Sequence, residues 1–223
     1  MPLKFPRPPD DCTTAANATL DSLWIRLSQP TSKAEGSKKA ILRKKTGSPQ
    51  VDPSTARRVY ILDRRGITPG AGLKKAKAAG WRYTIQARGG SSSRPVEAIS
   101  MAARAGEYIF NHISRDWLEQ KCLDAIEALA KLPQVRSGSF DVCMLRIASI
   151  YFVDALWLKT KRRNRDLIVP ISSSSKELVA RHLYSVREFL GILRKLASQQ
   201  VFNNRPRYSE SVPAIESKRK QPE

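Results

Sequence analysis

The sequence predicts one α+β domain with a mixed or mainly antiparallel sheet, covered by two or more helices and flanked by disordered basic arms. A long apolar stretch at residues 140–171, rich in β-branched and aromatic side chains, is typical of the centre of a sheet. Residues 114–132 and 185–199 carry apolar side chains three or four positions apart, which is the spacing of one helix face. The flanking segments are polar, basic and proline-containing, which favours disorder. We therefore expect three parts: a disordered arm at 1–56, the globular domain at 57–199 and a disordered tail at 200–223.

Residues 145–158 are almost all apolar, and continuous apolarity rather than alternation indicates strands that are covered on both faces. The run is too long for one strand, so we expect two strands, at 140–147 and 150–158. The run is also shorter than the roughly 20 apolar residues that cross a bilayer. Because Arg146 and Asp154 lie inside it, we predict no membrane span.

A cluster of cations follows, before a short third strand at 166–169 that we expect to end at Pro170. The cluster holds five basic residues and no acid: Lys159, Lys161, Arg162, Arg163 and Arg165. The simplest arrangement is an antiparallel meander with this loop at a hairpin tip. The loop has two interpretations, a solvated loop that blunts a sheet edge or a finger whose cations contact nucleic-acid phosphates.

The charge balance points to an anionic partner. Forty Lys and Arg residues against twenty Asp and Glu residues give a net charge of +20, and the pI is about 10.3. Nucleic acid is the first candidate, and anionic membrane surfaces and acidic proteins are the others. A second basic run at 33–45 has two interpretations, a solvated, mobile tail or, if the protein meets nucleic acid, a non-specific binding arm. Its candidate binding residues are Lys38, Lys39, Arg43, Lys44 and Lys45.

An apolar island at 20–27 interrupts the predicted N-terminal arm, after a proline-rich polar segment at 1–19. The island has two interpretations. It packs back onto the domain, or it is a short linear motif that docks into a groove of a protein partner. The docking residues would be Leu23, Trp24, Ile25 and Leu27.

Residues 59–85 read as a β-loop-α-β unit, with a strand at 59–62, a helix at 73–79 ended by Gly80, and a strand at 81–85. Parallel pairing of the two strands is plausible for such a unit. The glycine-rich loop before the helix has two interpretations, a tight turn or a weak phosphate-binding site. The site residues would be Gly70, Gly72, Lys74 and Lys75, although their pattern matches neither the P-loop nor the dinucleotide fingerprint.

Residues 95–113 fit either a helix or a hairpin that turns at 104–106, and we favour the hairpin because the turn carries a glycine. Ser114 is expected to cap a helix that runs to residue 132, with Glu119 near its first turn complementing the helix dipole. Ser185 and Glu188 have the spacing of a capping box at the start of a helix that ends by about residue 199.

The sequence carries no recognisable catalytic or metal-binding pattern. Its two histidines have no partner at metal-ligand spacing, so we expect no metal and no cofactor. Cys122 and Cys143 lie in apolar contexts and are expected to be buried and unreactive. We expect the carboxylates to lie mostly on helices as solvent-facing charges. The sparse, odd cysteine count and the absence of an apolar signal region in the first thirty residues favour a cytoplasmic location.

Three functions remain open, and an enzyme is the least favoured. The leading hypothesis is a non-enzymatic protein that contacts nucleic-acid phosphates through the basic arm and the basic loop, with salt-sensitive and sequence-tolerant binding. The second is a structural or adaptor subunit of a larger protein assembly, whose island and tails order on a protein partner. The third is an enzyme or binder of a phosphorylated small molecule at residues 70–75. The oligomeric state is left open.

Overall fold

A computed structural model describes residues 2–28, 49–86, 97–114, 117–147, 152–161 and 165–203. For residues 24–28, 86 and 200–203 it describes the backbone alone. The strands are β1 (Leu3–Lys4), β2 (Gln50–Ile61), β3 (Lys77–Gln86), β4 (Ala98–Arg104), β5 (Glu107–Ser114), β6 (Phe140–Ile147), β7 (Val153–Lys159), β8 (Leu167–Ser172) and β9 (Tyr184–Ser185). The helices are α1 (Asp10–Ser28), α3 (Arg64–Ile67), α4 (Leu118–Ala130), α5 (Pro133–Arg136) and α6 (Val186–Asn203), with a 3₁₀ turn, η1 (Leu73–Lys75).

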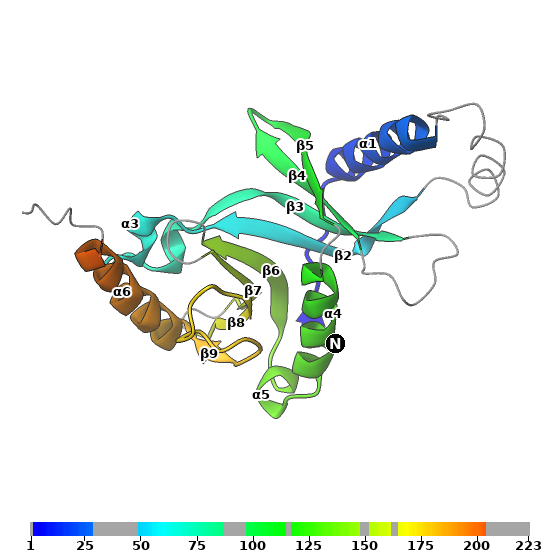
Figure 1. Cartoon of the computed structure of the whole chain (residues 1–223). Helices are drawn as coiled ribbons and strands as arrows, with labels where there is room; N and C mark the ends of the chain where they lie inside the picture. The colour runs from blue at the N-terminus through cyan, green and yellow to red at the C-terminus, as the bar shows by residue number, and fades with distance from the viewer. Residues whose placement is uncertain are drawn as a thin grey trace, which may run out of the picture.

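The strands form one mixed sheet in the order β5-β4-β3-β2-β6-β7-β8-β9, with β1 beside the start of β6 (Figure 1). β2 to β5 make one antiparallel meander, and β6 to β9 make a second. A parallel pair, β2 with β6, joins the two meanders through Val59, Tyr60 and Ile61. The predicted α+β domain with a mixed, helix-covered sheet is therefore confirmed.

Helices cover both faces of the sheet because neighbouring strand residues point to opposite faces. Tyr60 and Leu145 belong to the apolar cluster under α6, whereas Val59 and Met144 belong to the cluster under α4. Figure 1 shows α6 and α4 flanking the second meander. A third cluster joins α1 to β2, β3 and β4. No helix in the described ranges is both long and apolar enough to cross a membrane.

The centre of the sheet largely follows the prediction. The strand expected at 140–147 is β6, and the next strand is β7, which begins at Val153 rather than at residue 150. The third strand, β8, differs because Pro170 lies inside it rather than at its end. Pro170 is tolerated there since the register shifts between Asp154 and Ala155, and β9 pairs only with the first two residues of β8.

The predicted hairpin at 95–113 is also confirmed, as β4 and β5. Arg104 pairs with Glu107 across a two-residue turn, and both turn residues, Ala105 and Gly106, have positive φ angles. Such a turn suits the twist of antiparallel strands. The following helix, α4, begins at Leu118, so the expected N-cap was wrong, and Ser114 is the last residue of β5.

The helix expected at 73–79 was wrong. Only one 3₁₀ turn forms, at η1, and β3 begins at Lys77 and runs antiparallel to β2. A seven-residue helix is marginal in water, and pairing of Lys77 and Ala78 with β2 engages their backbone groups instead. Gly80 therefore lies within a strand, at φ +149°, instead of ending a helix.

The N-terminal segment 2–28 is folded, which corrects the expected disorder of 1–19. Cys12, Ala16 and Leu20 recur every four residues along α1 and are buried against β2, β3 and β4. Two of these three side chains are small, so the apolar face of α1 is weak in the sequence. Leu20 of the island packs onto the domain, and Leu23 is half-buried. The side chains of Trp24, Ile25 and Leu27 lie outside the described residues, as do the basic residues at 33–45.

Two glycine substitutions test the sheet and the last helix. In Gly80→Ala, the new Cβ would lie 1.8 Å from the Met101 carbonyl oxygen, so we expect a loss of at least about 2 kcal/mol of unfolding free energy. In the control Gly191→Ala, on α6, the Cβ meets no atom within 4 Å, and a gain of about 0.5–1 kcal/mol is expected. Urea unfolding measures both, and equal stabilities would contradict the β3–β4 register.

Candidate functional site

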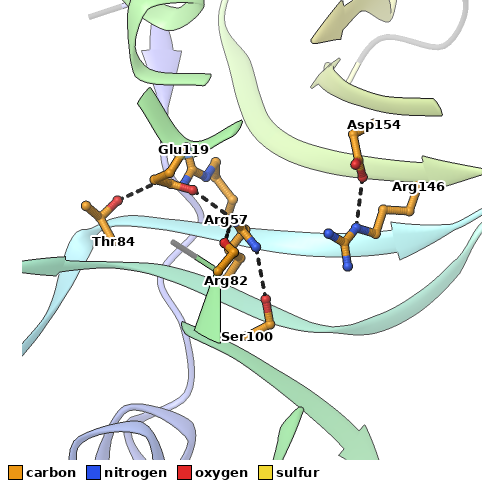
Figure 2. Close-up of polar contacts among 8 residues, drawn as sticks. Arg57, Arg82, Thr84, Ser100, Glu119, Arg146 and Asp154 are labelled. Carbon is orange, nitrogen blue, oxygen red and sulfur yellow. Dashed lines mark hydrogen bonds and ion pairs between the residues drawn. The ribbon is translucent and has the colours of Figure 1, made fainter. Parts of the chain in front are cut away.

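The first polar cluster is a buried network centred on Glu119, in the first turn of α4 (Figure 2). Its Oε2 accepts a hydrogen bond from Arg82 Nε at 2.9 Å, and its Oε1 accepts one from Thr84 Oγ1 at 2.9 Å. Arg57 Nη2 also donates to Oε1. Figure 2 shows both guanidinium groups converging on the carboxylate from adjacent strands. The network therefore fastens α4 to β2 and β3.

Arg82 extends this network across the first meander. Its Nη1 donates to Ser100 Oγ on β4 at 3.2 Å, and its Nη2 donates to Ser114 Oγ on β5. Arg57 is less well satisfied, because its buried Nε and Nη1 atoms have no hydrogen-bond partner. The cluster thus contains two guanidinium groups for one carboxylate.

The side chains of Arg57 and Glu119 are 0% exposed, and that of Arg82 is 1% exposed. Burial alone would raise the pKa of Glu119, but the charges and hydrogen bonds of Arg57 and Arg82 outweigh burial and hold this pKa below its usual range. The expectation of a solvent-facing carboxylate is therefore wrong for Glu119. A sealed network cannot meet a substrate, so we assign it to the architecture.

The sequence signal for this network is ambiguous. Arg82 and Thr84 alternate with the apolar residues of their strand, which is also the pattern of a strand with one solvated face. Only the packing of α4 over that face turns it into an interior. A second ion pair, Arg146 Nε with Asp154 Oδ1 at 2.8 Å, crosses from β6 to β7 and is partly exposed (Figure 2).

The second polar cluster is an open groove of about 850 Å³ at the end of the sheet where β6 begins. We call it the basic groove. Its wall includes four cations, and Asp141 is the one acid among its lining residues. The cations are Lys4, Lys159, Lys161 and Arg165. Residues 137–139, which follow α5, complete the groove with polar side chains and a glycine.

Lys159 is held in place by two aromatic rings. Its Nζ lies 5.0 Å from the ring centroids of both Tyr60 and Trp157, which contact each other edge-on. Both rings are buried, and the Trp157 Nε1 donates to Asp166 Oδ2 at 2.9 Å. Asp166 Oδ1 also accepts from the backbone N–H of Thr160 at 2.9 Å. The start of the basic loop is thus fixed to the sheet.

The structure brings together three of the five loop cations predicted from the sequence, namely Lys159, Lys161 and Arg165. Arg162 and Arg163 lie outside the described residues. Lys4 is a groove residue that sequence reasoning missed. It reaches the groove because β1 pairs in parallel with β6, with Lys4 opposite Asp141. A two-residue strand in a proline-rich segment gives no usable sequence signal.

The glycine-rich loop at 66–76 is a tight turn. The backbone N–H of Gly72 donates to the Gly66 carbonyl at 2.9 Å, and that of Lys75 donates to the Gly72 carbonyl at 3.0 Å. The N–H of Ala71 donates to Thr68. These amides donate within the loop and do not face a ligand. The backbone geometry therefore does not favour phosphate binding, which stays a prediction from the sequence for Gly70, Gly72, Lys74 and Lys75.

The cysteines and the other titratable groups form no reactive centre in the described part of the chain. Cys12, Cys122 and Cys143 are buried and free. Burial raises the pKa of the Cys122 thiol to about 11 and that of Cys143 to about 12, so both stay protonated and unreactive near neutral pH. Within the same residues, His, Cys, Asp and Glu side chains do not gather into a group of three that could hold a metal ion.

No protein-family model, curated protein or solved structure matches this chain. Its function is therefore argued from the chemistry of the described residues. Among these, the basic groove combines exposed charge, a concave surface and a rigidly held cation, so it is the candidate functional site.

The buried network predicts a specific pH dependence. Because folding lowers the pKa of Glu119, the ionised carboxylate stabilises the folded state. This stabilisation is present above the unfolded-state pKa of about 4.3 and is lost as the pH falls below that value. We expect Glu119→Gln to cost about 3 kcal/mol at neutral pH, since two buried cations lose their counter-charge. The variant should also lose less stability than the wild type on acidification.

The matched control is Glu127→Gln, which removes an exposed carboxylate from the same helix and should change stability by less than about 0.5 kcal/mol. Thermal unfolding followed by circular dichroism between neutral and acidic pH measures all three proteins. If Glu119→Gln kept the acid sensitivity of the wild type, Glu119 would not be the titrating group. Ser100→Ala is a milder second variant should Glu119→Gln fail to fold.

Proposed function

We propose that this protein is a non-enzymatic nucleic-acid-binding protein that holds backbone phosphates in the basic groove. The observation that carries the proposal is the convergence of Lys4, Lys159, Lys161 and Arg165 around one hollow that has a single acidic residue. The net charge of +20 adds long-range attraction to a polyanion. Phosphate contacts of this kind supply most of the free energy of sequence-independent binding.

Lys159 is suited to be the central phosphate contact. A free lysine loses roughly 1.5–2 kcal/mol of side-chain entropy when it is immobilised. Contact of its ammonium group with the faces of Tyr60 and Trp157 already restricts this side chain, so less freedom is lost on binding. Lys161 and Arg165 are exposed, and they would contact neighbouring phosphates from the rim of the groove.

The aromatic residues near the groove favour a duplex as the ligand. Proteins that bind single strands stack bases on exposed aromatic side chains. Tyr60, Phe140 and Trp157 are each at most 9% exposed, so their ring faces are covered. A groove that offers cations without a stacking platform fits the regular phosphates of a double helix, whose bases are already paired.

A second candidate function is an adaptor subunit, and the edge strand β5 is the observation that favours it. Ile109 and Phe110 on this strand are 38% and 42% exposed. Within the described residues, β5 pairs with β4 alone, so its outer edge offers backbone groups to a partner strand. This candidate takes precedence if the purified wild type binds no nucleic acid.

The groove is tested by replacing Lys4, Lys159, Lys161 and Arg165 together with glutamine. We expect duplex affinity to fall at least about tenfold, and the slope of log affinity against log salt to become shallower by up to about 0.9 per lost phosphate contact. Fluorescence anisotropy with a labelled duplex between about 50 and 200 mM salt measures both quantities.

The matched control removes the same number of charges from surfaces away from the groove. It carries glutamine at Arg104, Lys121, Lys176 and Arg181, which are all exposed. An equal loss of affinity in both variants would mean that net charge alone drives binding, and the groove would then have no special role. Duplex binding by neither the wild type nor the variants would contradict the proposed function.

The choice of ligand is tested by comparing a duplex with a single strand of the same length and mixed sequence. Because the groove lacks an exposed aromatic ring, we expect the wild type to bind the duplex more tightly by at least about fivefold at equal salt. Competition against the labelled duplex gives this ratio directly. A preference for the single strand would show that bases are stacked on the protein.

A further inference from the structure

A second basic surface lies at the other end of β6. It consists of five exposed cations on α3, η1 and α6: Arg64, Arg65, Lys74, Lys75 and Lys195. We call this set the α3–α6 surface. None of its members lines the basic groove. Four of these cations lie within residues 64–75, and the fold adds Lys195 from the distant helix α6.

Hydrogen bonds and apolar contacts bring the three elements together. The bond from Gly72 N–H to the Gly66 carbonyl folds η1 back toward α3. Arg194 Nε on α6 donates to the Ile67 carbonyl at the end of α3, at 2.9 Å. Leu73 and Leu190 lie in the same apolar cluster, which joins η1 to α6. The five cations therefore project from one joined unit.

Acidic residues do little to neutralise the α3–α6 surface. Asp63 is the one acid in the sequence between residues 62 and 80, and its side chain is engaged as the N-cap that accepts from Gly66 N–H at 3.0 Å. On α6 the one acid is Glu188, which bonds Ser185 in the predicted capping box, now confirmed. Glu177 interacts electrostatically with Lys195, so the four cations of residues 64–75 are the part of the surface with the fewest counter-charges, and such a group suits a polyanion.

The α3–α6 surface and the basic groove lie at opposite ends of the same strand. The groove includes Asp141 at the start of β6, and α3 follows Ile61, which is in register with Arg146 near the end of β6. At the rise of a β-strand, these two positions are about 17 Å apart. Figure 1 shows β6 running from α5 toward α3, and α6 covers one face of the sheet between them.

We propose that the α3–α6 surface is a second polyanion-binding site, so that one copy of the chain holds two nucleic-acid segments. This inference rests on the proposed function for the identity of the ligand. A helix is about 10 Å thick, so α6, which carries Lys195 of the α3–α6 surface, stands above the face of the sheet that it covers. In this proposal one duplex is seated in the groove and a second duplex occupies the α3–α6 surface.

Energy transfer between two duplexes tests this inference with the full chain. One duplex carries a donor dye and the other an acceptor dye, and the protein is added below the duplex concentration. Transfer reports bridging, and anisotropy with one labelled duplex reports simple binding. The test variant carries Arg64→Gln, Arg65→Gln, Lys74→Gln and Lys75→Gln. The control is the variant with glutamine at Arg104, Lys121, Lys176 and Arg181, which has the same net charge.

We expect the wild type and the control to bridge two duplexes. The test variant should bind one duplex with an affinity within about threefold of the control, whereas its energy transfer should fall at least about tenfold. Transfer that survives in the test variant would overturn the inference, because bridging would then come from another segment or from association of copies. Wild-type binding without transfer would overturn it as well. Absence of any duplex binding would instead remove the proposed function itself.

Discussion

The fold depends on the buried contact between Glu119 and the guanidinium groups of Arg57 and Arg82. Two positive charges and one negative charge are sealed together where the first turn of α4 meets the first meander, and removing the carboxylate would leave both cations without a counter-charge in the interior. Because Arg82 also bonds Ser100 and Ser114, the contact fixes the relative positions of four strands and a helix. Any other placement of α4 would break the bonds that Glu119 accepts from Arg57, Arg82 and Thr84.

The basic groove is linked to this contact through the chain that follows Glu119. α4 carries the chain from the network to α5 and then to Phe140, where β6 begins and the groove opens. The groove also needs β1, since Lys4 comes from this strand, which is fixed by its pairing with the start of β6 and by burial of Leu3 in the cluster under α4. Its chemistry is thus assembled from the N-terminal strand β1, from the segment that leads into β6, and from the loop between the core strands β7 and β8.

Sequence reasoning succeeded where the signal is local. The β-branched run at 140–147, the turn at Ala105 and Gly106, and the capping box of Ser185 and Glu188 each depend on residues close together in the chain. It failed where the local structure is determined by contacts with residues that are distant in the sequence. The pairing of Lys77 with β2 overrides helix propensity, and the strands that cover Cys12 and Ala16 create a core face from small residues. The groove cations of the β7–β8 loop were recognisable as a charge run, but their neighbour Lys4 was not.

The parallel pair of β2 and β6 has a consequence for how the chain folds. Each meander is built from hairpins whose strands are neighbours in the sequence, and such hairpins close quickly. The pair that joins them brings Tyr60 next to Leu145, with β3, β4, β5 and α4 between them in the sequence. Closing this long loop costs conformational entropy before the contacts of the pair can form. We therefore expect the two meanders to form early and their docking along β2 and β6 to be the late, slow step.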